Sequence, residues 1–333
     1  MKRAGSLYEY ICDPDNLRLA WYKAKRGKEG KSDVIHFGKH LRQNLNLLRD
    51  QLLSEEPEIG HYHFFTIYEP KERLICAASF PERVLHHAIM NVCHPFFEKF
   101  QIYHSYATRL GKGQYAALEY AKINQKKYEW FCKLDIRKYF DSISHELLLC
   151  YLHRHFKDNR LMTLFEKIIR SYHVSPDHGI PIGNLTSQYF ANFFLAFSDH
   201  YLLEKIRIPA FVRYMDDMVL WHYSKTALLE LQAELVAYLE VQLELECKPP
   251  CVNRQDHGLP FLGYVVFPDR VRLNRQSKQR FIRKTKFAAG MLGTDHWSQE
   301  EYSRHITPLI AFTKYAQTYY LRKNVFNLNL EAG

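Results

Sequence analysis

The sequence predicts an α+β fold, in which antiparallel strand pairs pack against amphipathic helices. Two segments predict the strand pairs, because residues 63–80 and Phe211–Trp221 each place strand-forming residues on both sides of a polar turn. Apolar residues at helical spacing predict the helices, most clearly over Val34–Leu53 and Lys225–Leu243. A hydrophobic content of 47% beside 25% charged residues is typical of a globular chain with a sizeable core.

The chain is basic, with 46 Lys and Arg residues against 36 Asp and Glu and a formal net charge of +10. Because the basic residues are spread along the chain, this charge favours a polyanionic partner, and nucleic acid is the commonest one. The 22 Phe and 23 Tyr residues are expected mostly to fill the core, while some are available to stack on bases. Charge alone does not separate an enzyme from a binding module.

Seven scattered cysteines and the absence of a long apolar run predict a protein of a reducing, cytoplasmic setting. Met1-Lys2-Arg3 leads into polar sequence rather than into the apolar core of a signal peptide. Cys247 and Cys251 resemble half of a zinc site, but only His257 is near them, so we expect no zinc.

The first 62 residues are predicted to be mainly helical. The helix over Val34–Leu53 ends before Pro57 and Gly60. Tyr22–Lys28 reads as a cationic loop that is either solvated or in contact with phosphate.

The strand pair at residues 63–80 carries Lys71 and Arg73 near its tip. Basic residues at an exposed tip are usually solvated, but an Arg fork beside a Lys point charge also suits a triphosphate. Helices are predicted next, over Glu82–Phe97 and Tyr115–Lys126.

An apolar strand that begins at Phe131 ends in Asp135, where a sheet would present a metal ligand. Asp141 is expected to shape the following turn, and Ser144 to cap a helix over His145–Phe156. After a helix over 161–173, a Gly/Pro loop at 178–188 leads into a long helix over about 186–206.

The strand pair Phe211–Trp221 carries two adjacent carboxylates, Asp216 and Asp217, in its turn. Asp is a common turn residue, but two neighbouring carboxylates between apolar strands also suit a bound Mg²⁺ ion. A second hairpin is predicted over 258–267, and from Asp269 onward the chain becomes basic and helical, with a final helix over Gln299–Lys323. We therefore divide the chain into residues 1–62, 63–267 and 268–333.

Asp135, Asp216 and Asp217 together form a candidate site for two divalent cations. Three carboxylates on neighbouring strands could hold two Mg²⁺ ions roughly 4 Å apart, with one ion activating a 3′-hydroxyl and the other stabilising a pyrophosphate leaving group. Positioning and electrostatics do most of the catalysis in such a nucleotidyl transfer.

Five motifs in order resemble those of reverse transcriptases. Tyr214-Met215-Asp216-Asp217 resembles the family's Y-x-D-D motif, and Leu134-Asp135 with Phe140-Asp141 resembles the preceding Asp-bearing motif. The others are the basic fingers hairpin (70–73), the loop that usually reads Pro-Gln-Gly-x-x-x-Ser-Pro (181–188) and the primer grip (261–263). The resemblance implies a right-hand polymerase fold, with a fingers extension (1–62), fingers and an antiparallel palm sheet packed on helices (63–267), and a small basic helical thumb (268–333).

The resemblance also implies roles for particular residues. Asp135, Asp216 and Asp217 would be catalytic metal ligands for two Mg²⁺ ions, with Mn²⁺ as a substitute, and the Ile136 carbonyl would help. Asp216 is expected to be the tighter ligand of the adjacent pair. The implied nucleotide-binding residues are Lys71, Arg73, Phe140 as a gate against the ribose 2′-hydroxyl, Ile182, Gly183, Gln188 and Lys248, and those of the primer grip are Phe261, Leu262 and Gly263.

Ile182 and Gln188 depart from the common family pattern, and this form resembles the reverse transcriptases of diversity-generating retroelements. That resemblance implies error-prone copying of a template-repeat RNA at adenines, from template RNA, primer and dNTPs, with a small basic accessory protein and no membrane. Alternatives are a retron-type or other bacterial reverse transcriptase, and an inactive RNA-binding protein with a polymerase fold. A group II intron protein and a ribonuclease H domain are disfavoured, because little chain follows the thumb.

Overall fold

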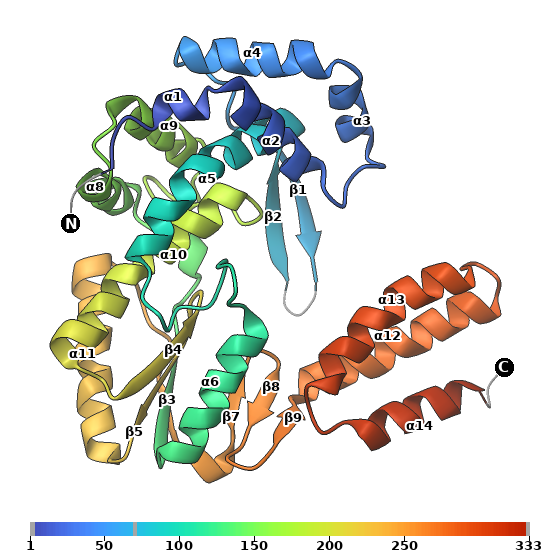
Figure 1. Ribbon diagram of the computed structural model, residues 1–333. Coiled ribbons are helices and arrows are strands. Elements are labelled where there is room, and N and C mark those ends of the chain that lie inside the picture. Colours follow the sequence, from blue (N-terminus) through green and yellow to red (C-terminus); the bar gives the residue numbers. More distant parts are fainter. Residues whose placement is uncertain (1–3, 69–71, 331–333) are drawn as a thin grey trace.

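The structure is a computed structural model that describes residues 4–68 and 72–330 (Figure 1). The longer helices, in chain order, are α2 (Pro14–Lys25), α3 (Ser32–Lys39), α4 (Leu41–Leu53), α5 (Phe80–Phe100), α6 (Gln114–Lys127), α8 (His145–His155), α9 (Asn159–Arg170), α10 (Leu185–Tyr201), α11 (Lys225–Leu243), α12 (Arg275–Gly293), α13 (Gln299–Lys314) and α14 (Tyr319–Leu330). Two single-turn helices, α1 (Tyr8–Ile11) and α7 (Tyr139–Ser142), complete the α-helices of these residues.

A four-stranded antiparallel sheet, the central sheet, pairs strands from distant parts of the chain. Its strands are β3 (Trp130–Asp135), β4 (Ala210–Tyr214), β5 (Asp217–His222) and β6 (Cys251–Arg254), in the order β4-β5-β3-β6. The sequence had not indicated β6, whose pairing with β3 joins residues more than a hundred positions apart. The remaining strands form the hairpin β1 (Tyr62–Ile67) and β2 (Arg73–Ala78), and a small sheet of β7 (Leu259–Phe261), β8 (Tyr264–Val266) and β9 (Val271–Leu273).

The two faces of the central sheet are buried against different partners. Because side chains alternate along a strand, Cys132 and Leu134 of β3 point to one face, where they pack into a large core that α10 and α11 complete. Phe131 points to the other face and packs with Val219 and Trp221 beneath α6 and the small sheet. The sheet is therefore held from both sides, which fixes the position of its strand ends.

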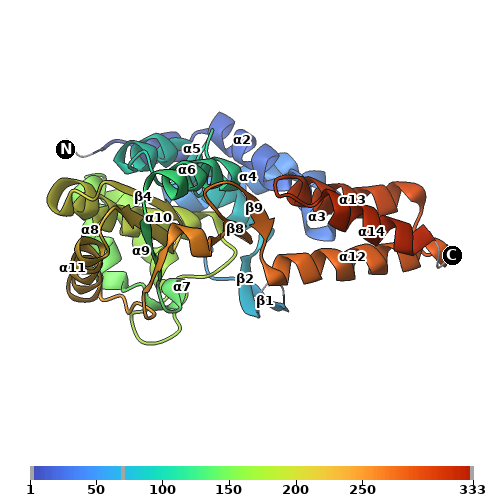
Figure 2. The ribbon, with the colours of Figure 1, turned by 90° about the horizontal axis from the view of Figure 1, so that it is seen from below.

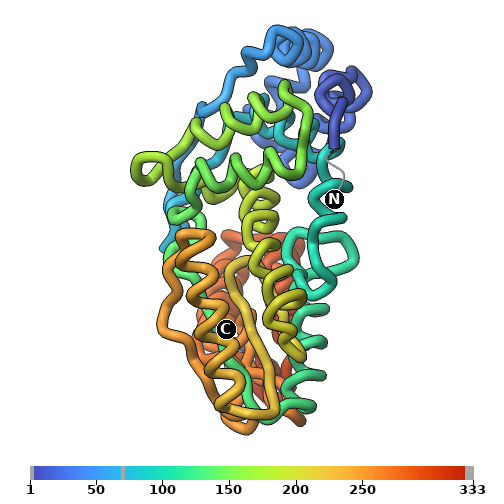
Figure 3. The backbone as a smooth tube through the Cα atoms, turned by 90° about the vertical axis from the view of Figure 1, so that its left-hand side faces the viewer, coloured from blue at the N-terminus to red at the C-terminus, as the bar shows by residue number. Residues whose placement is uncertain are grey.

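The β1–β2 hairpin and α12 approach the central sheet from different directions (Figure 1), and residues of all three line one cleft. The N-terminal helices (blue) lie at one end of the molecule, while α11 and the central sheet (yellow and green) lie at the other (Figure 3). Helices α12, α13 and α14 pack on one another and extend away from the sheet on the side opposite α11 (Figure 2).

Three predicted segments are divided differently from what the periodicity indicated. The helix expected over Val34–Leu53 is broken at His40, whose backbone (φ −116°, ψ 35°) is not helical. The final helix is broken before α14, where the Thr318 hydroxyl donates to the Thr313 carbonyl at 2.6 Å. The supposed loop Tyr22–Lys28 is helical up to Lys25. In each case the spacing of the apolar residues is nearly the same on both sides of the observed boundary, so periodicity does not show where that boundary lies.

The predicted boundary at residue 268 precedes β9, which pairs with β8, and the helices that follow it begin only at Arg275. No helix within residues 4–68 and 72–330 is long and apolar enough to cross a membrane.

Glu82 is a fully buried carboxylic acid in the first turn of α5. Its Oε2 accepts a hydrogen bond from the Gly60 amide at 3.2 Å, whereas its Oε1 has no hydrogen-bond partner among the described residues. The Oε1 atom lies 3.6 Å from Nε2 of the buried His86. Burial raises the pKa of Glu82 to about 7 and lowers the pKa of His86, so that both side chains tend to be neutral.

Replacing Glu82 with Gln is expected to change how stability depends on pH. The pKa of Glu82 is about 7 in the folded protein, above the ordinary value of 4.5. Between these two pH values the folded protein binds more protons than the unfolded chain, so the wild type loses stability as the pH rises. Relative to the wild type, Glu82→Gln should therefore gain ~3 kcal/mol of unfolding free energy from pH 4.5 to pH 8.

Urea unfolding of the two proteins at each pH measures this difference, in which the contribution of His86 largely cancels. The exposed Glu300→Gln serves as the control and should show no such trend. A difference between Glu82→Gln and wild type that stays constant with pH would contradict the prediction.

Candidate active site

The pairing of β3 with β5 brings the predicted carboxylates to one end of the central sheet. Asp135, the last residue of β3, lies directly opposite Asp217, the first residue of β5. Directly opposed residues of antiparallel strands point to the same face, so both side chains lie on the face that also carries Phe131 and Val219. The apolar part of that face is covered, and its acidic end is not.

A two-residue turn, Met215-Asp216, joins β4 to β5 and places the third carboxylate beside the other two. Met215 has φ +54°, in the left-handed region that residues with a side chain seldom adopt. Such a conformation persists only where the surrounding structure holds it, and it is often found at functional sites. The turn therefore presents Asp216 at a fixed, locally strained position.

Two lysines from different segments engage these carboxylates. Lys248 Nζ lies 2.6 Å from Oδ2 of Asp135, and Lys133 Nζ lies 3.2 Å from Oδ1 of Asp217. Lys133 also donates a hydrogen bond to the Pro260 carbonyl at 2.9 Å and so links Asp217 to the small sheet. Both ion pairs are partly exposed, with side-chain exposures between 25% and 40%.

Burial raises the pKa values of Asp216 and Asp217, that of Asp217 to about 6. Asp135 raises the pKa of Asp216 further by repulsion, while Arg73 and Lys248 lower it. Lys133 is the main neighbour that lowers the pKa of Asp217. The cost of ionising these carboxylates is therefore only partly offset by the side chains around them.

The donors at this end of the sheet fit a hard divalent cation. They are carboxylate oxygens, and Oδ1 of Asp217 is buried without a well-aligned hydrogen bond. A cation would offset the mutual repulsion that raises the pKa values. Within the described ranges, no three His, Cys, Asp or Glu side chains are already gathered as a metal site, and Cys247 and Cys251 belong to no such group. In the geometry seen here, lysines engage two of the three carboxylates.

The segment before β6 runs antiparallel to the residues that follow β3. Ile136 pairs with Cys247, and the Lys248 amide donates to the Asp135 carbonyl at 2.9 Å. This backbone pairing is what brings Lys248 to Asp135. Ile136 directly follows Asp135 in the chain, and its side chain is buried in the core.

The Ile182–Gly183 loop is fastened to β2. The Ile182 carbonyl accepts a hydrogen bond from the Cys76 amide at 2.8 Å. Gly183 has φ +125°, and a Cβ there would lie 2.9 Å from Cγ2 of Ile75, so a side chain is excluded on both counts. The Ile182 side chain is half-buried, and so is Gln188 in the first turn of α10.

Phe140 lies in the single-turn helix α7, directly after the segment that bears Asp135. Its carbonyl accepts from the Ile180 amide at 2.9 Å, which ties α7 to the loop that continues to Ile182. The Phe140 ring is half-buried and packs at the edge of the core. The ring is therefore only partly enclosed by the core.

The β7–β8 turn consists of Leu262 and Gly263, both with positive φ, as tight hairpins require. The Leu262 carbonyl accepts from Gln114 of α6, and the Gly263 carbonyl accepts from the Asn274 amide. Phe261 is buried and anchors the turn in the core. Leu262 and Gly263 are half-buried, so they are more accessible than the Phe261 ring.

A cleft of about 590 Å³ lies between these elements and reaches the candidate site at Asp217, whereas Asp135 and Asp216 do not line it. The lining residues come from the β1–β2 hairpin, the central sheet, the β7–β8 turn and α12. They are Tyr68, Arg73, Gln114, Lys133, Asp217, Pro260, Phe261, Leu262, Gly263, Asn274, Gln276, Ser277, Gln279, Arg280, Arg283 and Phe312. Lys71 lies outside the described residues.

Two charged residues at the site were missed by the sequence analysis. Lys133 stands two positions before Asp135, and strand alternation alone would have placed both side chains on one face. Arg213 precedes the turn and is fully buried, although it lies in an apolar strand. The signal for each was a charge at a position where the strand pattern calls for an apolar residue.

Comparison with known proteins gives consistent relatives. A sequence profile of the family described as reverse transcriptase (RNA-dependent DNA polymerase) matches residues 69–266. Protein YkfC of Escherichia coli (strain K12) is 26% identical over 309 residues, which cover 75% of this chain and 79% of YkfC. A putative COX1/OXI3 intron 1 protein of Saccharomyces cerevisiae is 24% identical over 220 residues, which cover 61% of this chain but 26% of that protein.

Among solved structures, a telomerase from Candida albicans in complex with a fragment of telomeric RNA aligns with a TM-score of 0.50 at 10% identity. The alignment covers 84% of this chain and 58% of the telomerase chain, so this chain spans little more than half of that protein. At this identity the likeness concerns the fold alone. It confirms the predicted α+β right-hand polymerase fold.

Replacing Lys133 with Met is expected to raise the pKa of Asp217 above its value of about 6, because the main neighbour that lowers it is lost. The pH at which Mg²⁺ binding is half-maximal should move up by ~1 unit, because the cation competes with a proton for this carboxylate. Isothermal titration calorimetry with Mg²⁺ across a pH series measures the shift. The exposed Lys126→Met is the control, and an unmoved midpoint in Lys133→Met would refute the coupling.

Proposed function

The chain belongs to the reverse transcriptase family, and on this premise we propose that it is an RNA-directed DNA polymerase that uses two-metal nucleotidyl transfer. The observation that carries the proposal is the register that sets Asp135 against Asp217 and leaves Asp216 in the adjoining turn. These carboxylates stand at the uncovered end of the sheet, beside a cleft with basic residues from both the β1–β2 hairpin and α12.

Asp135, Asp216 and Asp217 would hold two Mg²⁺ ions, or Mn²⁺ as a substitute, with help from the Ile136 carbonyl. Such ions, when bound, favour the deprotonated primer 3′-hydroxyl and offset the charge of the triphosphate and its leaving pyrophosphate. Asp216 is proposed as the tighter ligand of the pair, since Lys133 engages Asp217 at 3.2 Å and competes with a cation there.

Other residues would bind and orient the nucleotide. Arg73, together with Lys71, would hold the triphosphate, and Lys248 could supply a proton to pyrophosphate from its place beside Asp135. The half-buried Phe140 ring would exclude a ribose 2′-hydroxyl. Leu262 and Gly263, which line the cleft, would support the primer end.

We further propose the diversity-generating subtype, in which the enzyme makes error-prone cDNA from a template-repeat RNA with a small basic accessory protein. The support is the Ile182 and Gln188 form of the loop before α10. An Ile side chain offers no hydrogen bond, so a mispair would lose less transition-state stabilisation there than with Gln. The alternatives are a retron-type or other bacterial enzyme, the latter in keeping with the likeness to YkfC. An intron-type enzyme, which the sequence analysis disfavoured, is supported by the likeness to the intron 1 protein.

Purified protein is expected to extend a DNA primer on an RNA template with Mg²⁺ and dNTPs. Asp216→Asn should reduce the rate by ~10²-fold or more, because the ligand charge is lost while the shape is kept. The exposed Asp256→Asn is the matched control and should retain the wild-type rate. Synthesis that survives Asp216→Asn would refute the metal assignment. An inactive wild type that still binds RNA tightly would favour the RNA-binding alternative.

Ile182→Gln is expected to lower misincorporation opposite template adenine by ~10-fold relative to wild type, because a hydrogen bond near the nucleotide sharpens discrimination. Sequencing of cDNA made on a template with adenines measures the error rate. Val174→Gln, at an exposed aliphatic position of the preceding loop, controls for the added amide. Equal fidelity in Ile182→Gln and wild type would reject this role for Ile182.

A further inference from the structure

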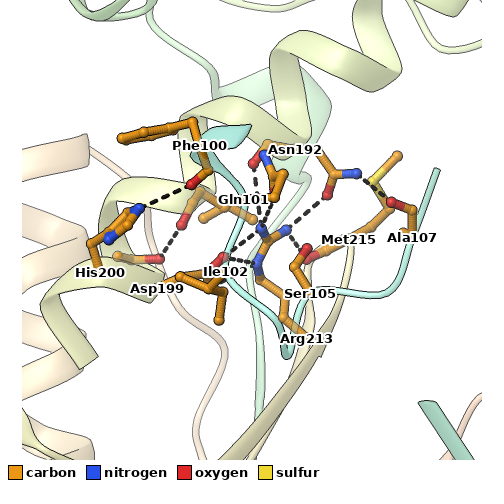
Figure 4. A network of polar contacts seen from close by, with 12 residues as sticks. Phe100, Gln101, Ile102, Ser105, Ala107, Asn192, Asp199, His200, Arg213 and Met215 are labelled. Atoms are coloured by element: carbon orange, nitrogen blue, oxygen red, sulfur yellow. Dashed lines mark hydrogen bonds and ion pairs between the residues drawn. The ribbon is translucent and has the colours of Figure 1, made fainter. Parts of the chain in front are cut away.

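Arg213, the penultimate residue of β4, is a fully buried cation directly before the Met215-Asp216 turn. Its charge is balanced by Asp199 of α10, which is also fully buried. The Nε atom donates to the Asp199 carboxylate at 2.8 Å and the Nη2 atom does so at 2.6 Å, which is the paired geometry of an Arg fork on a carboxylate (Figure 4).

The guanidinium group uses its remaining hydrogens to contact two other segments and a second residue of α10. Nη2 also donates to Oε1 of Gln101, which follows α5, at 3.2 Å. Nη1 donates to Oδ1 of Asn192 in α10 at 2.9 Å and to the Met215 carbonyl at 3.1 Å. A buried Arg with this many partners is satisfied, and its plane cannot rotate without breaking several bonds.

The bond to the Met215 carbonyl bears directly on Asp216. The peptide group between these residues is planar, so a fixed Met215 carbonyl also fixes the amide of Asp216 and the direction in which its Cα follows. Met215 has φ +54°, which a residue with a Cβ adopts only under constraint. Arg213 Nη1 supplies a constraint of this kind from within the core.

Asn192 and Asp199 link Arg213 to α10, the helix that follows the Ile182–Gly183 loop. They are seven positions apart on α10, so they lie about two turns apart on one face of the helix. Asn192 also donates to the Ala107 carbonyl at 2.7 Å, and His200 is hydrogen-bonded to the Phe100 carbonyl, so α10 is held from several sides (Figure 4). The same helix begins at Leu185, directly after the Ile182–Gly183 loop.

We propose that Arg213 is a positioning residue for the candidate active site, which orients the Asp216 carboxylate through the Met215-Asp216 peptide. The inference rests on the proposed function of Asp216 as a metal ligand. The ion pair with Asp199 keeps the cation in the core, and the planar fork directs Nη1 at the Met215 carbonyl. A lysine could keep the charge pairing with Asp199 but could not maintain both branches.

The test compares Arg213→Lys with Gln101→Leu, because the latter removes a different bond from the same guanidinium group. Both variants are first examined by thermal unfolding, and measurements are made well below the lower Tm. Arg213→Lys is expected to weaken Mn²⁺ binding, measured by calorimetry, by ~10-fold and to raise the Mg²⁺ requirement of primer extension similarly. Gln101→Leu should leave both within ~2-fold of wild type, and binding of the RNA–primer duplex should be unchanged in both variants.

A second substitution tests the peptide itself. Glycine adopts positive φ without strain, so adding Met215→Gly to Arg213→Lys should recover part of the lost Mn²⁺ affinity. If Arg213→Lys does not fold, Asn192→Ala loosens the same Nη1 atom while leaving the ion pair with Asp199, and it should raise the Mg²⁺ requirement by ~3-fold.

Equal metal affinities in Arg213→Lys and Gln101→Leu would overturn the proposal, as would an unchanged Mg²⁺ requirement in Asn192→Ala where that variant has to be used. A wild type that binds Mn²⁺ but synthesises no DNA would reject the proposed function, while the calorimetric comparison would still decide the role of Arg213. A wild type that binds no Mn²⁺ at all would reject both.

Discussion

Three carboxylates meet at the end of a sheet that is buried on both faces, and the charge of this group has to be compensated within the fold. Asp135 and Asp217 are directly opposed across β3 and β5, and Asp216 lies in the adjoining turn. Burial and mutual repulsion raise the pKa values of the last two. Ionised carboxylates in such a place are stable only if cations, from side chains or from solution, stand close to them.

The compensating cations come from separate segments of the chain, which the fold brings together at the site. Lys133 lies on β3, Lys248 follows α11, and Arg73 begins β2. Arg213 belongs to a second layer, because it pairs with Asp199 in the core and contacts the backbone of the turn. At the exposed ion pairs another cation can replace a lysine, whereas the buried pair of Arg213 and Asp199 holds the turn in place.

The open space in front of the carboxylates is bounded by elements that differ in how firmly they are attached. The β7–β8 turn is tied to α6 and to Asn274, and the loop at Ile182 is bonded to β2. By contrast, β1 and the residue that follows it leave Phe64, Phe65 and Tyr68 exposed. A basic cleft bounded by firmly bonded elements suits a long polyanion such as a template with its primer, in keeping with the family to which the chain belongs.

The local features of the fold could be predicted from patterns in the sequence. Helix α11, the hairpin β4–β5 and the strand ending in Asp135 all follow from periodicity and turn chemistry within about 20 residues. Tertiary structure alone decided the break at His40, the addition of β6, and the approach of Lys248 to Asp135. It also decided the partners of Lys133 and Arg213, two charges that stood out in their strands without indicating what they would meet. These features depend on contacts between residues far apart in the chain, and a local pattern carries no information about which distant segment will supply the partner.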